Sequence, residues 1–203
     1  MSAYPIVLEG TAISALVVGG GRVAERKARA LVEAGAQVHV VAPSVSDQIQ
    51  SIAATCDRLR ITRERYAREH IDGATLVIAA TDDPAVNALV RADARAAGRL
   101  VNVVDAPDTG DFISPAVHRC GDIVVAVSAG GVPQAAARIR DSIARTIDAR
   151  YAGAIGDLAE LRRALIARGD RDRWGTAAAA LLGDDFCERV ESGELAAGLE
   201  QWR

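Results

Sequence analysis

The chain has 203 residues, of which half are hydrophobic and a quarter are charged, and its formal net charge is −3 at pH 7. This length suits one compact α/β domain with a smaller annex, and the composition is typical of an ordinary globular protein. The negative balance argues against nucleic-acid binding through bulk electrostatics. Aromatic residues make up only 3% of the chain, so the core must be built from Ala, Val, Leu and Ile.

The cysteines and the lengths of the apolar runs indicate in which cellular compartment the protein is expected. Cys56, Cys120 and Cys187 are far apart in sequence and show no metal-ligand spacing, which is typical of free thiols in a reducing compartment. The first ten residues lack the charged and apolar regions of a signal peptide. No apolar stretch is long enough to span a membrane. We therefore expect a cytoplasmic protein with no membrane association and no permanent metal site.

The first predicted elements surround a glycine-rich turn. Residues 4–8 are predicted to form a short lead-in strand. Residues 14–24 read SALVVGGGRVA, an apolar run that ends in three glycines before a helical pattern. A strand, a tight turn and a helix start are the context in which G-x-G-x-x-G/A indicates dinucleotide binding. Gly19 permits the turn and Gly21 lets a pyrophosphate approach the backbone. A strand–helix turn without a ligand is the alternative.

The second predicted strand, 37–42, ends where a dinucleotide site receives the adenosine ribose. An acidic residue about 20 residues after the glycines normally binds the ribose 2′-hydroxyl. Here Pro43 and Ser44 take that place, and no arginine is present to receive a 2′-phosphate. This strand end therefore favours neither NAD nor NADP. Ser44 either donates to the ribose or caps the next helix.

Residues 75–80 are apolar throughout, which predicts a strand buried on both faces. Either Asp82 or Asp83 is expected to cap the following helix, with Pro84 in its first turn. Ligands of doubly wound sheets lie across the carboxyl ends of the strands. Thr81 and Asp82 are therefore candidates for cofactor contacts. Asn87, one turn into the helix, is interpreted as structural.

A further strand, 100–104, delivers Asp105 to the same predicted edge of the sheet. A carboxylate at the end of a buried strand, beside a cofactor cleft, is placed to act as a general base. The alternative is a turn-forming aspartate before Pro107, and the spacing does not separate the two interpretations.

The composition changes after this strand. Residues 112–119 contain a turn and the basic pair His118 and Arg119, residues 122–128 read as a strand, and a glycine turn precedes a predicted helix over 134–150. The remainder is helical and charged. The prediction is an α/β protein with a Rossmann-type doubly wound parallel sheet over 1–112. A small β/α dimerisation region over 113–150 and a C-terminal helical region over 151–203 follow it.

Five runs resemble one family: VVGGGRVAERKARALVEAGAQVHVVAP, AATDDPAVN, VNVVDAP, FISPAVHR and VAVSAGG. They are similar to precorrin-2 dehydrogenase, the amino-terminal part of siroheme synthase, and cover residues 4 to about 150 in unbroken order. The resemblance implies an NAD-linked oxidation of precorrin-2 to sirohydrochlorin. In bifunctional members it implies the insertion of Fe²⁺, a substrate, to give siroheme. It also implies an intertwined homodimer.

The resemblance also assigns roles to residues of this chain. It implies that Asp105 is catalytic and that the cofactor contacts are Gly19, Gly20, Gly21, Arg22, Val23, Pro43, Ser44 and Thr81. The tetrapyrrole is rich in carboxylates, so a net-negative protein needs local cations to bind it. His118, Arg119 and Arg138 are the candidates, together with Ser128 at the second glycine turn, which is expected to border the tetrapyrrole.

One departure from the family concerns that second turn. Related sequences commonly place further hydroxyl residues and a T-S-P after the strand, whereas this chain has the shorter SAGGVP over 128–133. The change bears on iron insertion more than on the dehydrogenase reaction. Two alternatives follow: a dehydrogenase without chelatase activity, and a regulatory module that senses NAD without catalysis. An oxidoreductase for a small hydroxy acid would need an acid–base Lys, His or Tyr, and none is evident.

Overall fold

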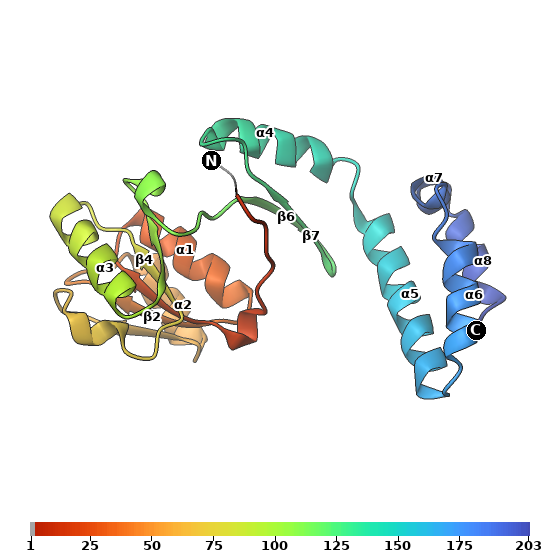
Figure 1. Cartoon of the computed structure of the whole chain (residues 1–203), viewed down its shortest axis with the longest axis horizontal. Helices are drawn as coiled ribbons and strands as arrows, with labels where there is room; N and C mark the ends of the chain where they lie inside the picture. Colours follow the sequence, from red (N-terminus) through yellow and green to blue (C-terminus); the bar gives the residue numbers. More distant parts are fainter. Residues whose placement is uncertain (1–2) are drawn as a thin grey trace. The chain divides into compact units, whose positions relative to one another are not determined.

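The computed structural model describes residues 3–203 and divides the chain into two compact units, one ending at Ser114 and one spanning Pro115–Arg203 (Figure 1). The second unit joins the last two regions expected from the sequence, and the boundaries given for those regions stay a prediction.

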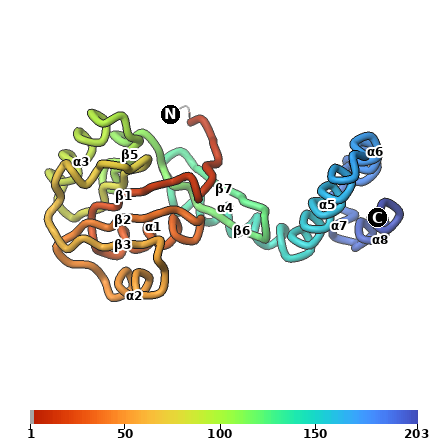
Figure 2. The backbone as a smooth tube through the Cα atoms, turned by 90° about the horizontal axis from the view of Figure 1, so that it is seen from below, coloured from red at the N-terminus to blue at the C-terminus, as the bar shows by residue number. Residues whose placement is uncertain are grey.

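The first unit is built on a five-stranded, fully parallel sheet in the order β3-β2-β1-β4-β5. Figure 2 shows β1, β2 and β3 running side by side. The doubly wound parallel sheet predicted from the sequence is confirmed. Its strands are β1 (Ser14–Val18), β2 (Gln37–Val41), β3 (Leu59–Thr62), β4 (Leu76–Ala79) and β5 (Leu100–Val103).

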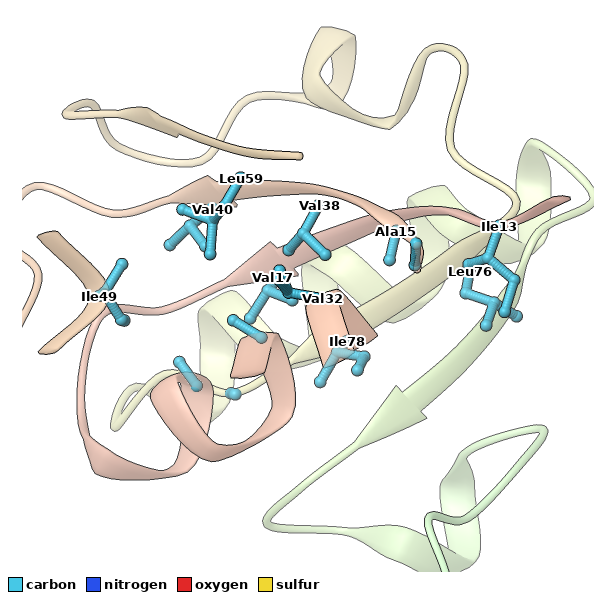
Figure 3. Close-up of a cluster of buried hydrophobic side chains, with 14 residues drawn as sticks. Ile13, Ala15, Val17, Val32, Val38, Val40, Ile49, Leu59, Leu76 and Ile78 are labelled. Carbon is cyan, nitrogen blue, oxygen red and sulfur yellow. The ribbon is translucent and has the colours of Figure 1, made fainter. Parts of the chain in front are cut away.

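Helices cover both faces of this sheet because the strands are apolar on both faces. On one face, α1 (Arg22–Glu33) and α2 (Asp47–Thr55) pack on alternate strand residues, among them Val17, Val38, Val40 and Ile78 (Figure 3). On the other face, α3 (Pro84–Ala96) and the short 3-10 helix η2 (Arg68–Ile71) pack on the intervening residues. Two apolar cores, one on each face, therefore hold the sheet in place, and with it the loops at its edges.

The predicted lead-in strand over residues 4–8 is wrong. These residues form no regular element, and Tyr4 and Val7 are 88% and 85% exposed. The reason is the position of β1, which already pairs with β2 on one side and β4 on the other. A preceding strand therefore has no free hydrogen-bonding edge of β1 to join. The segment enters β1 through the 3-10 helix η1 (Gly10–Ala12) instead.

The second unit begins with an antiparallel hairpin of β6 (Ala116–Cys120) and β7 (Ile123–Val127). Gly121 has φ +56° at the first position of its two-residue turn, which suits a type II′ hairpin. The helix α4 (Pro133–Ala144) packs against both strands. The sequence reading predicted β7 but missed β6, where a proline and two basic residues obscure the alternation.

The single helix predicted over 134–150 is also wrong. Helix α4 ends at Ala144, and α5 (Ala149–Ala167) starts after a break. The Asp148 side chain accepts from the backbone N–H of Arg150 at 2.9 Å, so it caps a new helix rather than continuing the old one.

Four helices complete the second unit: α5, α6 (Arg171–Leu181), α7 (Phe186–Ser192) and α8 (Glu194–Glu200). They share an apolar core of Tyr151, Leu158, Leu161, Leu165, Ala177, Leu181, Val190, Leu195 and Leu199. Among residues 3–203, no helix has the length and apolar character needed to cross a membrane.

Candidate functional site

The carboxyl-terminal edge of the parallel sheet gathers most of the predicted site residues. Backbone hydrogen bonds continue past the strand ends, from Gly19 N to Val41 O at 3.0 Å, from Ala80 N to Val18 O at 2.8 Å, and from Val104 N to Ala79 O at 3.0 Å. The loops after β2, β1, β4 and β5 are therefore linked to one another. The strand order reverses between β1 and β4, and such a switch point is where open α/β sheets bind ligands.

The three glycines of the turn have different surroundings. Gly19 has φ +128°, and a Cβ atom built on it would overlap the carbonyl of Ala80. A Cβ atom on Gly20 would overlap the carbonyl of Ser44. Gly21, which precedes α1 and provides no side-chain cap, faces open space with nothing within 4 Å of its built Cβ. Two glycines thus let the loops pack, and the third leaves the helix N-terminus accessible.

This accessible N-terminus fits a pyrophosphate. The first-turn N–H groups of a helix and its dipole both favour a negatively charged ligand. The acid in the first turn, Glu25, is engaged elsewhere: it accepts from Arg29 at 2.9 Å and from the Ser46 hydroxyl at 3.0 Å. Arg22 is exposed at the first position of α1, and Val23 beside it is half-buried. The residues present therefore suit a dinucleotide phosphate.

The structure excludes one of the two roles predicted for Ser44, the capping of α2. Ser46, not Ser44, caps α2, because its hydroxyl accepts from the backbone N–H of Ile49 at 3.3 Å. Pro43 and Ser44 are both exposed at the end of β2. The capping role for Ser44 is wrong, and its ribose contact stays a prediction.

The two aspartates after β4 also have separate positions. Asp83 caps α3, accepting from Ala85 N at 2.8 Å and Val86 N at 3.4 Å. Asp82 is exposed and is the aspartate left for a ligand. The Thr81 hydroxyl contacts the carbonyl of Asp83 at 3.0 Å and the side chain of Asn87 at 2.7 Å. Thr81 thus shapes its own loop, and its cofactor contact stays a prediction.

Asp105 lies two residues beyond β5 and is exposed at the same edge. Its Oδ1 accepts from Asn87 Nδ2 at 3.0 Å. Asn87 is only 1% exposed, and its side chain also contacts the backbone of Thr81. The sequence reading took Asn87 as structural and missed this link. The signal was its position four residues after the capping Asp83, since side chains on a helix point back toward its N-terminus.

The remaining predicted residues belong to the second unit. His118 Nε2 lies 2.8 Å from the carbonyl of Ile147, so this imidazole holds the break between α4 and α5. Arg119 is exposed, while His118 points to the opposite face of the hairpin because neighbouring strand residues alternate. Ser128 is exposed just after the end of β7. Arg138 is exposed on α4. The basic pair of the sequence therefore does not form one patch within the unit.

A cavity of about 360 Å³ opens at the other, amino-terminal edge of the sheet, and none of the predicted site residues lines it. His39 and His70 lie there with ring centroids 5.9 Å apart. His39 is bonded to Thr62 Oγ1 at 2.8 Å and to an Arg60 nitrogen at 3.1 Å. Burial, then the charge of Arg60 and that of His70, lower the pKa of His39 to about 4.

The parallel sheet, the glycine turn and the open helix N-terminus at the switch point define a Rossmann-type dinucleotide-binding domain. Residues 6–116 match the family described as "Putative NAD(P)-binding". The chain belongs to this NAD(P)-binding family, and it corresponds to the amino-terminal dehydrogenase part of siroheme synthases. Its cofactor is NAD.

Relatives with curated names support this assignment over most of the chain. The siroheme synthase of Saccharophagus degradans is 37% identical over 207 residues, covering 97% of this chain and 43% of that protein. The siroheme synthase of Chromobacterium violaceum is 44% identical over 152 residues, covering 74% of this chain and 32% of that protein. The chain thus spans less than half the length of these relatives.

Among solved structures, the precorrin-2 dehydrogenase SirC superposes with a TM-score of 0.78 and 29% sequence identity. The match covers 98% of this chain and 100% of SirC. The likeness therefore includes the hairpin and the C-terminal helices as well as the nucleotide-binding sheet.

Proposed function

We propose that this protein is an NAD-dependent precorrin-2 dehydrogenase, which oxidises precorrin-2 to sirohydrochlorin. The observation that carries the proposal is the position of Asp105, a carboxylate at the same sheet edge as the open N-terminus of α1. The end-to-end likeness to SirC supports it, because that match leaves no large segment of either chain unaccounted for.

The reaction removes a hydride and a proton from precorrin-2. When bound, NAD⁺ supplies the acceptor for the hydride. Gly21 and the first turn of α1 hold its pyrophosphate, and Ser44 and Asp82 contact its ribose groups. The Asp105 carboxylate takes the proton as general base. The protein's main contribution is to hold the cofactor and the tetrapyrrole in reacting positions.

Basic side chains of the second unit bind the substrate carboxylates in this proposal. Arg119 and Arg138 are exposed, so their guanidinium groups are available for charge-assisted, bidentate hydrogen bonds. Ser128, which is exposed just after β7, adds a hydroxyl donor. His118 contributes less than expected from the sequence, because its Nε2 is already bound to Ile147.

We also propose that the protein is a homodimer whose interface includes the outward face of the hairpin. Helix α4 covers one face of the β6–β7 pair, while Val117 and Val124 on the other face remain 37% and 41% exposed. A second copy of the same hairpin offers a matching apolar face.

Two finer proposals concern iron and compartment. Fe²⁺ is a second substrate if the same site also inserts metal; Asp105 then receives one of the two pyrrole N–H protons that the metal displaces, and the other goes to solvent. A cytoplasmic location is supported by the free state of Cys56, Cys120 and Cys187.

The test is anaerobic turnover of precorrin-2, followed by absorbance, with and without NAD⁺. Sirohydrochlorin is expected to form only with NAD⁺, and Asp105→Asn is expected to slow its formation about 100-fold while NAD⁺ still binds. Asp108→Asn, in the same exposed loop, is the matched control. An absence of oxidation by the unmodified protein would leave an NAD-binding module without this chemistry. Fe²⁺ or Co²⁺ is then added, and the rate of metal insertion is compared with that of a protein-free control.

A further inference from the structure

Asn87 connects the loop after β4 to the carboxylate after β5 through one buried amide group. Its Oδ1 accepts from Thr81 N at 3.1 Å and from the Thr81 hydroxyl at 2.7 Å. Its Nδ2 donates to Thr81 O at 3.0 Å and to Asp105 Oδ1 at 3.0 Å. Both donors and both acceptor positions of the amide are thus occupied.

These contacts determine which end of the amide faces Asp105. The backbone N–H of Thr81 can only donate, so the Asn87 oxygen must face Thr81. The amide nitrogen is then directed to Asp105 and can only donate to it. The contact therefore suits Asp105 as an unprotonated carboxylate, the form that a general base must have before it takes a proton.

We infer that Asn87 is a positioning residue that orients Asp105 for proton transfer and fixes it relative to the Thr81 loop. One hydrogen bond restrains Oδ1, and within residues 3–203 no partner is found for Oδ2, which is the oxygen that meets the substrate. The inference rests on the proposed dehydrogenase function, because it assigns Asn87 a role through Asp105. Without the amide, the exposed carboxylate would rotate freely and point toward the substrate only part of the time.

Asn87→Asp tests this role with little change in shape. The new carboxylate still accepts from the Thr81 N–H and hydroxyl, so two of the three hydrogen bonds to Thr81 are retained, but it can donate neither to the Thr81 carbonyl nor to Asp105. We expect turnover to fall about 10- to 100-fold, as for a misplaced reacting group, with the Kd for NAD⁺ within about threefold of its original value.

Asn102→Asp is the matched control, since Asn102 is also a buried asparagine and is 4% exposed. Its Nδ2 donates to the Phe112 carbonyl at 2.8 Å, and among the described residues Asn102 makes no hydrogen bond to Asp105. If lost stability alone explained the effect at position 87, N102D would lose turnover in proportion to its own fall in Tm. We expect N102D to lose stability while keeping turnover within about threefold at temperatures where it is folded.

A double-mutant cycle with Asp105→Asn separates the inference from the proposed function. If Asp105→Asn alone has no effect on turnover, the proposed base is wrong. If Asp105→Asn slows turnover but Asn87→Asp does not, the role of Asn87 is overturned. It is also overturned if Asn87→Asp slows turnover as much in the Asp105→Asn background as alone. We expect a further loss below twofold in that background.

The same cycle has a readout that does not depend on turnover. In the double variant, an amide at position 105 faces a carboxylate at position 87, so the hydrogen bond is restored with its donor and acceptor exchanged. The Tm of the double variant should therefore exceed that of Asn87→Asp, although activity does not return. A Tm at or below that of Asn87→Asp would show that the two side chains do not interact in solution.

Discussion

Gly20 lies so close to the carbonyl oxygen of Ser44 that a Cβ atom built on the glycine would overlap that oxygen. Gly21, the next residue, has nothing within 4 Å of the same built atom. The two positions therefore make different demands on a side chain. The first is required for the loops after β1 and β2 to pack, and the second leaves space for a ligand.

Gly20→Ala is expected to destabilise the domain, and Gly21→Ala is expected to weaken cofactor binding. The methyl group at position 20 must displace backbone, a change of the kind that costs about 1–3 kcal/mol. The methyl group at position 21 meets no protein atom but occupies the approach to the N-terminus of α1. Thermal unfolding and NAD⁺ titration of both variants check this. Equal losses of affinity and equal changes in Tm would contradict it.

The arrangement of the sheet was predictable because its strands are short apolar runs separated by glycines, prolines and helical stripes. The runs that became β1, β2, β4 and β5 were identified from that pattern, and so was the edge that carries Asp105. The strand β6 was not, because Pro115 and the pair His118 and Arg119 hide its alternation of half-buried and exposed residues.

The hydrogen-bond partners at the site were less predictable than its backbone. A serine, threonine or aspartate near a helix start satisfies a cap equally well at neighbouring positions, so the sequence left Ser44 and Asp82 ambiguous. Backbone geometry decided between them and placed the caps at Ser46 and Asp83. The link from Asn87 to Asp105 joins α3 to the end of β5, and no local spacing rule encodes a contact between residues 18 positions apart.

Acid should destabilise the first unit through His39. Its pKa in the folded protein is about 4, against 6.5 as the ordinary value, so the folded state resists protonation. Between pH 6.5 and 4 the unfolded chain binds more protons at this residue, and stability therefore falls as the pH is lowered through that window. His39→Gln should flatten the dependence of Tm on pH there, because it removes the titrating group.

His118→Gln serves as the comparison for that measurement, since it removes a histidine from the second unit. The pH dependence of unfolding of the first unit should be unchanged in this variant. If Tm still falls as steeply between pH 6.5 and 4 in His39→Gln as in the unmodified protein, His39 is not the group responsible for that fall.

Lys27 on α1 lowers the stability of the folded protein at neutral pH, because its charged ammonium is partly buried. Burial, followed by repulsion from Arg26, lowers its pKa from 10.5 to about 8. At pH 7 the ammonium is charged in both states, so the folded state bears the full penalty. Between pH 8 and 10.5 the unfolded chain holds more protons, and stability rises with pH. Lys27→Met should thus stabilise the protein at pH 7, by about 1 kcal/mol after solvent screening.

The advantage of Lys27→Met should shrink as the pH rises toward 10.5, because the unmodified side chain then folds in its neutral form. Denaturant unfolding at pH 7 and pH 10 measures both points. Arg65→Met, which removes an exposed cation elsewhere in the first unit, is the control for general charge effects. A gain for Lys27→Met that is equal at the two pH values would contradict the assigned cause.

Val124 on β7 is the residue with which we test the proposed dimer. It lies opposite Arg119 in the hairpin and is 41% exposed on the face that α4 does not cover. An aspartate there would face Arg119 across the hairpin, but it would remove the apolar contact between copies, and the desolvation of a buried ion pair can exceed its Coulombic gain. Val124→Asp should therefore yield monomers in analytical ultracentrifugation. Leu182→Asp, at a 47% exposed apolar residue after α6, should leave the dimer intact; if it dissociates the dimer while Val124→Asp does not, the interface involves the C-terminal helices instead.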